Sequence, residues 1–102
     1  MIVVKTDLHR SIEVKGHAGY APAGQDIVCA AVSILYETLK RVLVQPMEAE
    51  FTEDEDHVRI DIHMENLSFA RYRYLDFFIV GIATLEHAYP QHVQLYRAIK
   101  RA

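Results

Sequence analysis

Two short segments of this chain alternate between apolar and polar residues, and this alternation limits the folds open to it. The segments are Ser11–Lys15 and His57–Met64. A period of two belongs to a strand that buries one face. In the second segment the inward side chains are then Val58, Ile60, Ile62 and Met64. Another strand-like run, Ile2–Thr6 or Met47–Thr52, precedes each segment across a polar turn, which predicts two β-hairpins.

A longer segment, Ile27 to about Val44, has the residues of a helix. Asp26 in front of it is a good N-cap, and Pro46 behind it ends the helix. Its first two turns are apolar nearly all round, which is typical of a helix that is buried on every side. We therefore expect this helix to be central and not laid on the surface of the protein.

A second helix is predicted from Asn66 or Ser68 to about Tyr89. Its buried stripe comprises Leu75, Phe78, Ile79, Ile82 and Leu85. His92–Arg97 follows as a last strand, so the element order is ββ-α-ββ-α-β. Because hairpins imply antiparallel pairing, we predict the α+β class, with a mainly antiparallel sheet carrying two helices. A chain of 102 residues suits a single domain over residues 1–102.

The segment Gly16–Gln25 interrupts these patterns and has almost no bulky aliphatic residue. Three of the chain's four glycines lie in it: Gly16, Gly19 and Gly24. Glycine permits backbone conformations that other residues avoid, and irregular loops of this length are often functional. We interpret the segment as a substrate loop with high mobility over residues 18–25. Within it, Tyr20 is either a substrate contact or an exposed loop aromatic.

Cys29 is the one cysteine of the chain, and with Asp26 as the cap it falls in the first turn of the helix. Unpaired backbone N–H groups and the positive end of the helix dipole gather there, and both favour a thiolate over a thiol. The same N–H groups are candidates to stabilise an oxyanion on a substrate carbonyl. His17 lies twelve positions upstream, where a strand end and a loop can bring it to the helix start. Such a Cys–His pair performs nucleophilic catalysis.

Spacing alone leaves alternatives open for each of these residues. A cysteine on an apolar helix is often only a small packed hydrophobe. A thiol redox protein would need a resolving cysteine, which this chain lacks. Asp26 is either a structural cap or the group that orients His17. Ser33, one turn beyond Cys29, bonds into the site or bonds its own helix backbone.

The chain has the sequence GHA at residues 16–18, then a short variable loop, then DIVCAAVS at residues 26–33. This combination resembles the ribosomal-processing cysteine protease family, Prp, also called the YsxB-like family. The resemblance implies an endopeptidase that removes the N-terminal extension of large-subunit ribosomal protein twenty-seven. It implies His17 and Cys29 as the catalytic pair, with Asp26 and Ser33 in support, and it implies a homodimer. The alternative is a non-enzymatic ribosome-associated module in which the cysteine is merely packed.

Charge and composition argue against other classes of protein. A formal charge of −3 is unlike that of a protein that binds nucleic acid directly. The apolar run Met1–Val4 is too short for a signal peptide or a membrane span, so we predict a cytoplasmic protein. The histidine spacings fit no metal site, and we predict neither metal nor cofactor.

The acidic stretch Glu48–Asp56 is a solvated hairpin or a surface that attracts a basic ribosomal protein. The aromatic row Phe69, Tyr72, Tyr74, Phe77 and Phe78 is core or dimer contact.

Overall fold

The computed structural model describes residues 1–7, 10–22, 24–43, 49–63 and 69–98. Its elements in chain order are β1 (Ile2–Asp7), β2 (Ser11–Lys15), α1 (Ile27–Val42), β3 (Ala49–Glu53), β4 (His57–Ile62), α2 (Phe69–Ala88) and β5 (Val93–Ala98). The predicted element order is confirmed. The predicted positions Met47 and Met64 lie outside the described residues.

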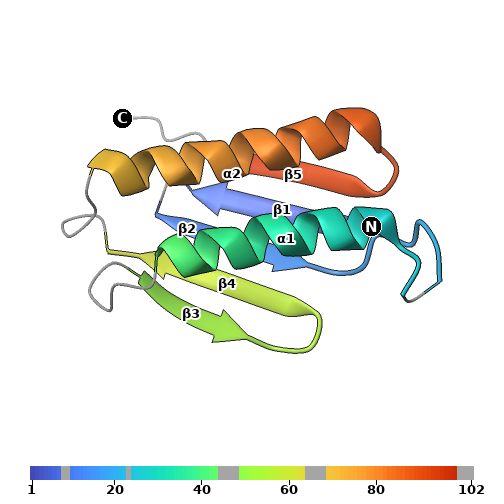
Figure 1. Cartoon of the computed structure of the whole chain (residues 1–102), viewed down its shortest axis with the longest axis horizontal. Coiled ribbons are helices and arrows are strands. Elements are labelled where there is room, and N and C mark those ends of the chain that lie inside the picture. The colour runs from blue at the N-terminus through green and yellow to red at the C-terminus, as the bar shows by residue number, and fades with distance from the viewer. Residues whose placement is uncertain (8–9, 23, 44–48, 64–68, 99–102) are drawn as a thin grey trace.

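The strands form one five-stranded sheet in the order β3-β4-β2-β1-β5 (Figure 1). The pairs β1–β2 and β3–β4 are the two predicted hairpins, and β2 and β4 join them in antiparallel register. The last strand, β5, runs parallel to β1 at the edge of the sheet. The sheet is therefore mainly antiparallel, as predicted, with one parallel pair that the hairpin argument did not include.

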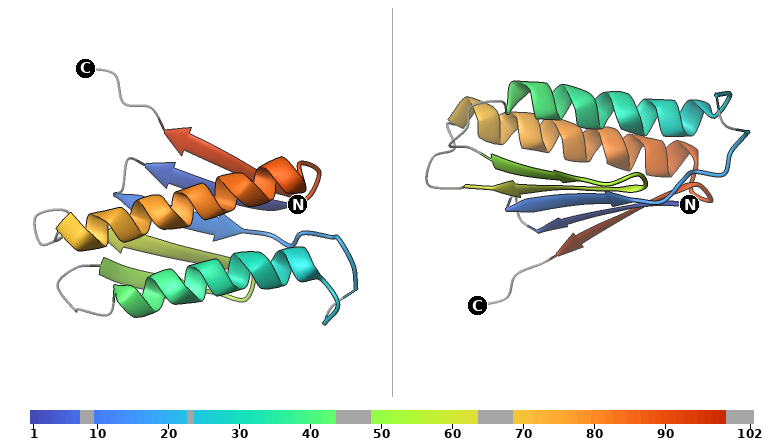
Figure 2. Two further views of the ribbon diagram at one scale, coloured as in Figure 1. Left: turned by 45° about the horizontal axis from the view of Figure 1, so that its top comes forward. Right: turned by 90° about the horizontal axis from the view of Figure 1, so that it is seen from below.

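Both helices cover the same face of the sheet, which gives a two-layer fold (Figure 2). The face of α1 that contacts the sheet carries its buried residues, Val28, Val32, Tyr36 and Leu39. The expectation that α1 is central and buried on every side is wrong, because Ile27 and Ile34 are 55% and 64% exposed. In two layers a helix has only one neighbouring sheet and one neighbouring helix, so part of even an apolar helix faces outward.

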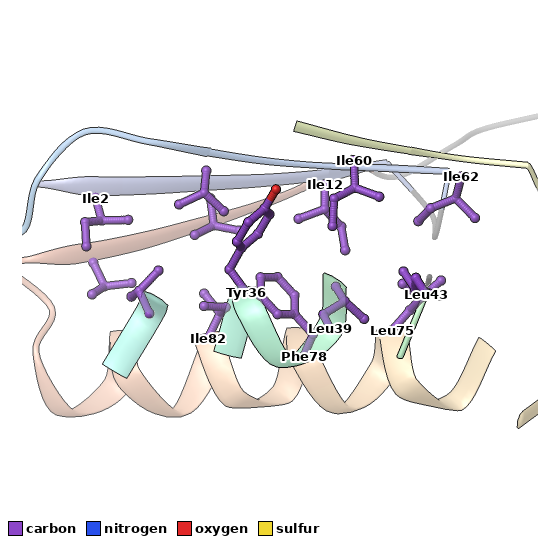
Figure 3. Packing of buried hydrophobic residues seen from close by; sticks show 14 of the residues in the cluster. Ile2, Ile12, Tyr36, Leu39, Leu43, Ile60, Ile62, Leu75, Phe78 and Ile82 are labelled. Carbon is purple, nitrogen blue, oxygen red and sulfur yellow. The ribbon is translucent and has the colours of Figure 1, made fainter. Parts of the chain in front are cut away.

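The hydrophobic core lies between the helices and the sheet (Figure 3). The predicted stripe of α2 is confirmed, since Leu75, Phe78 and Ile82 are buried and Ile79 and Leu85 pack against them. On β4 the inward positions are also confirmed: Ile60 and Ile62 are buried, and Val58 is half-buried against the core.

The two helices approach each other closely at one point. A Cβ atom added at Gly81 of α2 would lie 3.0 Å from both Cδ atoms of Leu35 on α1. Glycine at this position therefore lets the branched end of Leu35 fit against the backbone of α2. Within the described ranges, neither helix has the length and hydropathy needed to cross a bilayer.

Candidate active site

Cys29 is the third residue of α1, and the turn around it is organised by Asp26. The Asp26 backbone is extended (φ −86°, ψ 99°), and its Oδ1 atom accepts hydrogen bonds from the N–H groups of Val28 at 3.0 Å and Cys29 at 2.9 Å. This is the geometry of a helix N-cap, so the capping prediction is confirmed. Cys29 is half-buried, and its thiol is free of any disulfide.

The other oxygen of Asp26 holds the loop that precedes the helix. Its Oδ2 atom accepts from the N–H groups of Tyr20 at 3.0 Å and Ala21 at 3.4 Å. The N–H of Cys29, and to a lesser degree the other three N–H groups, hold the pKa of the Asp26 carboxyl below its usual value, although burial acts the other way. One carboxylate thus ties the middle of the loop to the start of α1.

This arrangement corrects one expectation about the helix start. The N–H groups of Val28 and Cys29 were candidates to stabilise a substrate oxyanion, but both already donate to Asp26. An oxyanion would have to displace the cap to reach them. The charge of Asp26 also lies beside the first turn, where it offsets part of the positive end of the helix dipole.

Asp26→Asn tests this double role through the pH dependence of stability. Asparagine can still cap α1 with its carbonyl oxygen, but its NH₂ group cannot accept from Tyr20. The pKa of Asp26 is lowered by folding, so its stabilising effect is present above the unfolded value and is lost as pH falls through the lower folded value. We expect wild type to exceed Asp26→Asn in urea midpoint by more at about pH 6 than at about pH 3. An equal gap at both pH values would contradict this reading.

Ala18, directly after His17, brings the loop against the sulfur. Its backbone N–H donates to Sγ of Cys29 at 3.3 Å, and its side chain is only 2% exposed. His17 itself is exposed. Within the described part of the chain its imidazole makes no hydrogen bond, either to Cys29 or to Asp26. The predicted pair is therefore linked through the Ala18 backbone, and among the described residues the His17 imidazole has no hydrogen-bond partner.

Two cavities meet at His17, Cys29 and Ser33. The first, of about 370 Å³, extends from these residues over the sheet to the turn between β3 and β4. The second, of about 490 Å³, extends along the loop past Gly19, Gly24 and Asp26. Cys29 thus lines both cavities, together with His17 and Ser33.

One wall of the first cavity is fixed by contacts between α1 and β3. The Tyr36 hydroxyl donates to Oε2 of Glu53 at 2.7 Å, and Lys40 Nζ lies 2.7 Å from the same oxygen. Burial, together with the bond to Glu53, raises the pKa of the Tyr36 hydroxyl. These contacts hold the acidic turn over the cavity, because Glu53 begins that turn and is tied to the helix at two points.

Gly16 closes the other side of the first cavity, and its backbone requires glycine. Its φ is +92°, and a Cβ atom there would lie 2.6 Å from the carbonyl oxygen of Met1. Its N–H also donates to the carbonyl of Asp56 at 3.0 Å. The end of β2 is thus pressed between the chain start and the β3–β4 turn.

Gly16→Ala is therefore expected to destabilise the fold more than Gly19→Ala does. Both glycines have positive φ, which costs alanine about 1 kcal/mol or slightly more. Only Gly16 adds a collision with backbone, worth about a further 1–3 kcal/mol, whereas no atom lies within 4 Å of a Cβ at Gly19. Urea unfolding of the two variants measures the difference. Equal losses would show that the contact with Met1 carries no cost.

Most residues predicted for the site do gather around the sulfur. The residues that line one or both cavities are Gly16, His17, Gly19, Gly24, Asp26, Cys29 and Ser33. Tyr20 is not among them. Its ring lies edge-on to those of Tyr89 and His92, with centroids 5.5 and 5.3 Å away. Of its two predicted roles, the loop aromatic fits this position better.

Two residues at the site were missed by sequence reasoning. Ala18 belongs to the GHA sequence, but its contact with the sulfur is made by the backbone N–H. The type of residue at position 18 therefore does not predict this contact. His92 was predicted only as the first residue of the last strand, yet its Nδ1 atom lies 2.9 Å from the Ala18 carbonyl. Across the ranges that the structure describes, no three His, Cys, Asp or Glu side chains are placed to hold a metal ion.

Comparison with known proteins identifies the relatives of this chain. The family described as Cysteine protease Prp matches residues 1–94. The ribosomal processing cysteine protease Prp of Mycoplasma pneumoniae is 31% identical over 86 residues, which cover 83% of this chain and 84% of that protein. Among solved structures, the S. aureus ribosomal processing protease Prp with a covalently linked product peptide has a TM-score of 0.88 at 21% identity, covering 96% of this chain and all of that one.

SMU.848 from Streptococcus mutans has a TM-score of 0.76 at 25% identity and covers 97% of this chain and 93% of that one. The structural likenesses support the fold, and the family match spans nearly all of the described strands and both helices. The chain therefore belongs to the Prp family of cysteine proteases.

Proposed function

We propose that this protease removes the N-terminal extension from the precursor of large-subunit ribosomal protein twenty-seven, with Cys29 as nucleophile and His17 as base. The observation that carries the assignment is the place of Cys29: it lies at a helix start and lines two cavities that His17 also lines. The M. pneumoniae relative is a ribosomal processing enzyme, and the S. aureus relative has been solved with a substrate peptide and with a covalently linked product peptide.

The reaction follows from the two side chains. The Cys29 thiolate adds to the scissile carbonyl carbon, and the carbonyl electrons move onto oxygen. Collapse of this intermediate breaks the C–N bond, and the His17 imidazolium gives its proton to the leaving amine. A thioester on Cys29 remains. Neutral His17 then takes a proton from water, whose oxygen attacks the thioester and releases the carboxylic acid product and the thiolate.

Two features beside the Cys29 sulfur can stabilise the negative charge that it carries as a nucleophile. The N–H of Ala18 donates to Sγ, and a hydrogen bond to sulfur favours its charged form. The start of α1 adds the part of its positive dipole that the Asp26 charge does not offset. We assign Asp26 a supporting role as cap and loop tether, since its oxygens accept four backbone N–H groups. Ser33 lines both cavities and is placed to contact bound peptide.

The substrate proposal is supported by charge around the first cavity. Four carboxylates line it without a described ion pair: Glu37, Asp54, Glu55 and Asp56. A negative surface beside the nucleophile attracts basic chains and raises their encounter rate. Ribosomal proteins are basic because they bind RNA, so the acidic turn complements such a precursor.

We further propose a single catalytic domain over residues 1–102, acting in the cytoplasm as a homodimer without direct nucleic-acid contact. The outer face of the helix layer supports the dimer: Phe77, Val80 and Ile34 are 75%, 60% and 64% exposed, and a groove of about 380 Å³ runs between α1 and α2 beside them.

Phe77→Glu should then convert the dimer to a monomer in light scattering.

The alternative of a non-enzymatic ribosome-associated module is wrong, because the chain belongs to a protease family. What needs testing is the substrate. The purified enzyme is incubated with ribosomal protein twenty-seven carrying its extension and with the same protein lacking it, and the products are read by intact-mass spectrometry. We expect one new N-terminus from the extended protein and none from the other. Failure to cut the extended protein, with cleavage of unrelated peptides, would overturn the substrate assignment.

A further inference from the structure

Ala18 joins the sulfur to a distant part of the fold through its two backbone groups. Its N–H donates to Cys29 Sγ at 3.3 Å, and its carbonyl oxygen lies 2.9 Å from Nδ1 of His92. A carbonyl oxygen can only accept, so Nδ1 of His92 must carry the hydrogen. The imidazole of His92 is thereby fixed as an Nδ1–H donor. The loop, the start of α1 and a turn 74 positions further along the chain thus meet at this one buried residue.

His92 is itself held in place from three directions. Its N–H donates to the carbonyl of Tyr89 at 2.9 Å, at the end of α2. Its carbonyl accepts from the N–H of Ile2 at 2.8 Å, at the start of β1. Its ring lies edge-on to that of Tyr20, with centroids 5.3 Å apart and planes at 81°. The turn between α2 and β5 therefore presents a fixed donor to the loop.

We infer that His92 is a positioning residue for the nucleophile, acting through Ala18. This inference rests on the proposed role of Cys29. The bond from Nδ1 fixes the Ala18 backbone, and the Ala18 N–H then stays directed at Sγ, where it stabilises the thiolate. The same bond fixes the backbone next to His17 and so sets where its imidazole can reach. His92 touches neither sulfur nor substrate in this scheme.

His92 could instead act only through the packing of its ring. Two substitutions separate this structural role from the positioning role. His92→Phe keeps a planar ring of similar size against Tyr20 but has no donor. His92→Asn loses the ring but places an N–H close to the position of Nδ1. If His92 acts by packing, the phenylalanine variant resembles wild type. If His92 acts by its hydrogen bond, the asparagine variant resembles wild type instead.

The experiment measures two properties of each folded variant, checked by circular dichroism at the assay temperature. The first is the rate of Cys29 alkylation by iodoacetamide between pH 5 and pH 9, which needs no substrate. The second is kcat and KM on the extension peptide. His87→Ala is the matched control, because His87 is an exposed histidine at the end of α2 that lines neither cavity.

We expect His92→Phe to lower the alkylation rate at pH 7 by about three- to tenfold and kcat by about tenfold, with a smaller change in KM. His92→Asn should stay within about twofold of wild type in both measurements, and His87→Ala should match wild type. The inference is overturned if His92→Phe behaves like wild type, or if both His92 variants lose reactivity equally.

These results are separable from the proposed function. Alkylation reports the coupling of His92 to Cys29 even when no peptide is cut. If a Cys29→Ala variant is inactive while His92→Phe is normal in both assays, only the positioning role fails. If Cys29→Ala still cuts the precursor, the catalytic assignment fails, and the alkylation rates alone decide whether His92 controls the thiol.

Discussion

Replacing Cys29 by alanine is expected to abolish cleavage of the extended ribosomal protein, with a loss of about 10⁴- to 10⁶-fold in kcat/KM. No other cysteine exists in the chain, so no second thiol can form the thioester. The fold should survive the change, because Cys29 is only half-buried and alanine is the best helix former. The variant should also bind the uncut precursor, since both cavities remain.

The measurement is single-turnover cleavage followed by mass spectrometry, with the binding of uncut precursor recorded by calorimetry. Arg41→Ala is the control, because Arg41 is exposed on the same helix and lines neither cavity. A Cys29→Ala variant that retains more than about one hundredth of the wild-type rate would remove Cys29 from the mechanism.

Replacing His17 by alanine is expected to lower kcat by about 10²- to 10⁴-fold, the usual contribution of a general acid–base group. Removal of an acid–base group should also change the shape of the pH–rate profile. Stability should change little, because His17 is exposed and its imidazole has no hydrogen bond among the described residues. Loss of rate without loss of stability is the signature of a catalytic group.

Rates measured from pH 5 to pH 9 test this expectation, with His63→Ala as the control. His63 is a half-buried histidine beyond β4 that pairs with Glu50 and lies outside both cavities. If His17→Ala keeps both the wild-type rate and the wild-type pH profile, another group serves as the base.

The elements of the fold were predictable because their signals are local. Alternation along Ser11–Lys15 and His57–Ile62 depends on neighbouring residues, and so does the cap formed by Asp26. The place of β5 beside β1 was not predictable, because nothing in six residues of strand sequence states which edge they join. The exposure of Ile34 was missed for a related reason: an apolar residue type does not tell how many layers surround a helix.

The candidate site also has one part that the sequence predicts and another part that it does not. Its helix start could be predicted, since Cys29 follows Asp26 at a fixed helical spacing. The contact of Ala18 with sulfur depends on how the whole loop folds, and the contact of His92 depends on a strand added 74 positions later. Hydrogen bonds made by backbone groups depend little on residue type, so the sequence does not reveal them. The catalytic roles of Cys29 and His17, and the mobility of residues 18–25, stay predictions.

The place of the first two residues affects how the enzyme should be handled. Ile2 lines the first cavity, and the Met1 carbonyl rests against Gly16. An affinity tag fused ahead of Met1 would emerge at the mouth of that cavity, where it would compete with added peptide or be cut as one. Because β5 runs parallel to β1, it finishes at the end of the sheet away from Ile2 (Figure 2). A tag joined after β5 would leave the cavity clear for kinetic work.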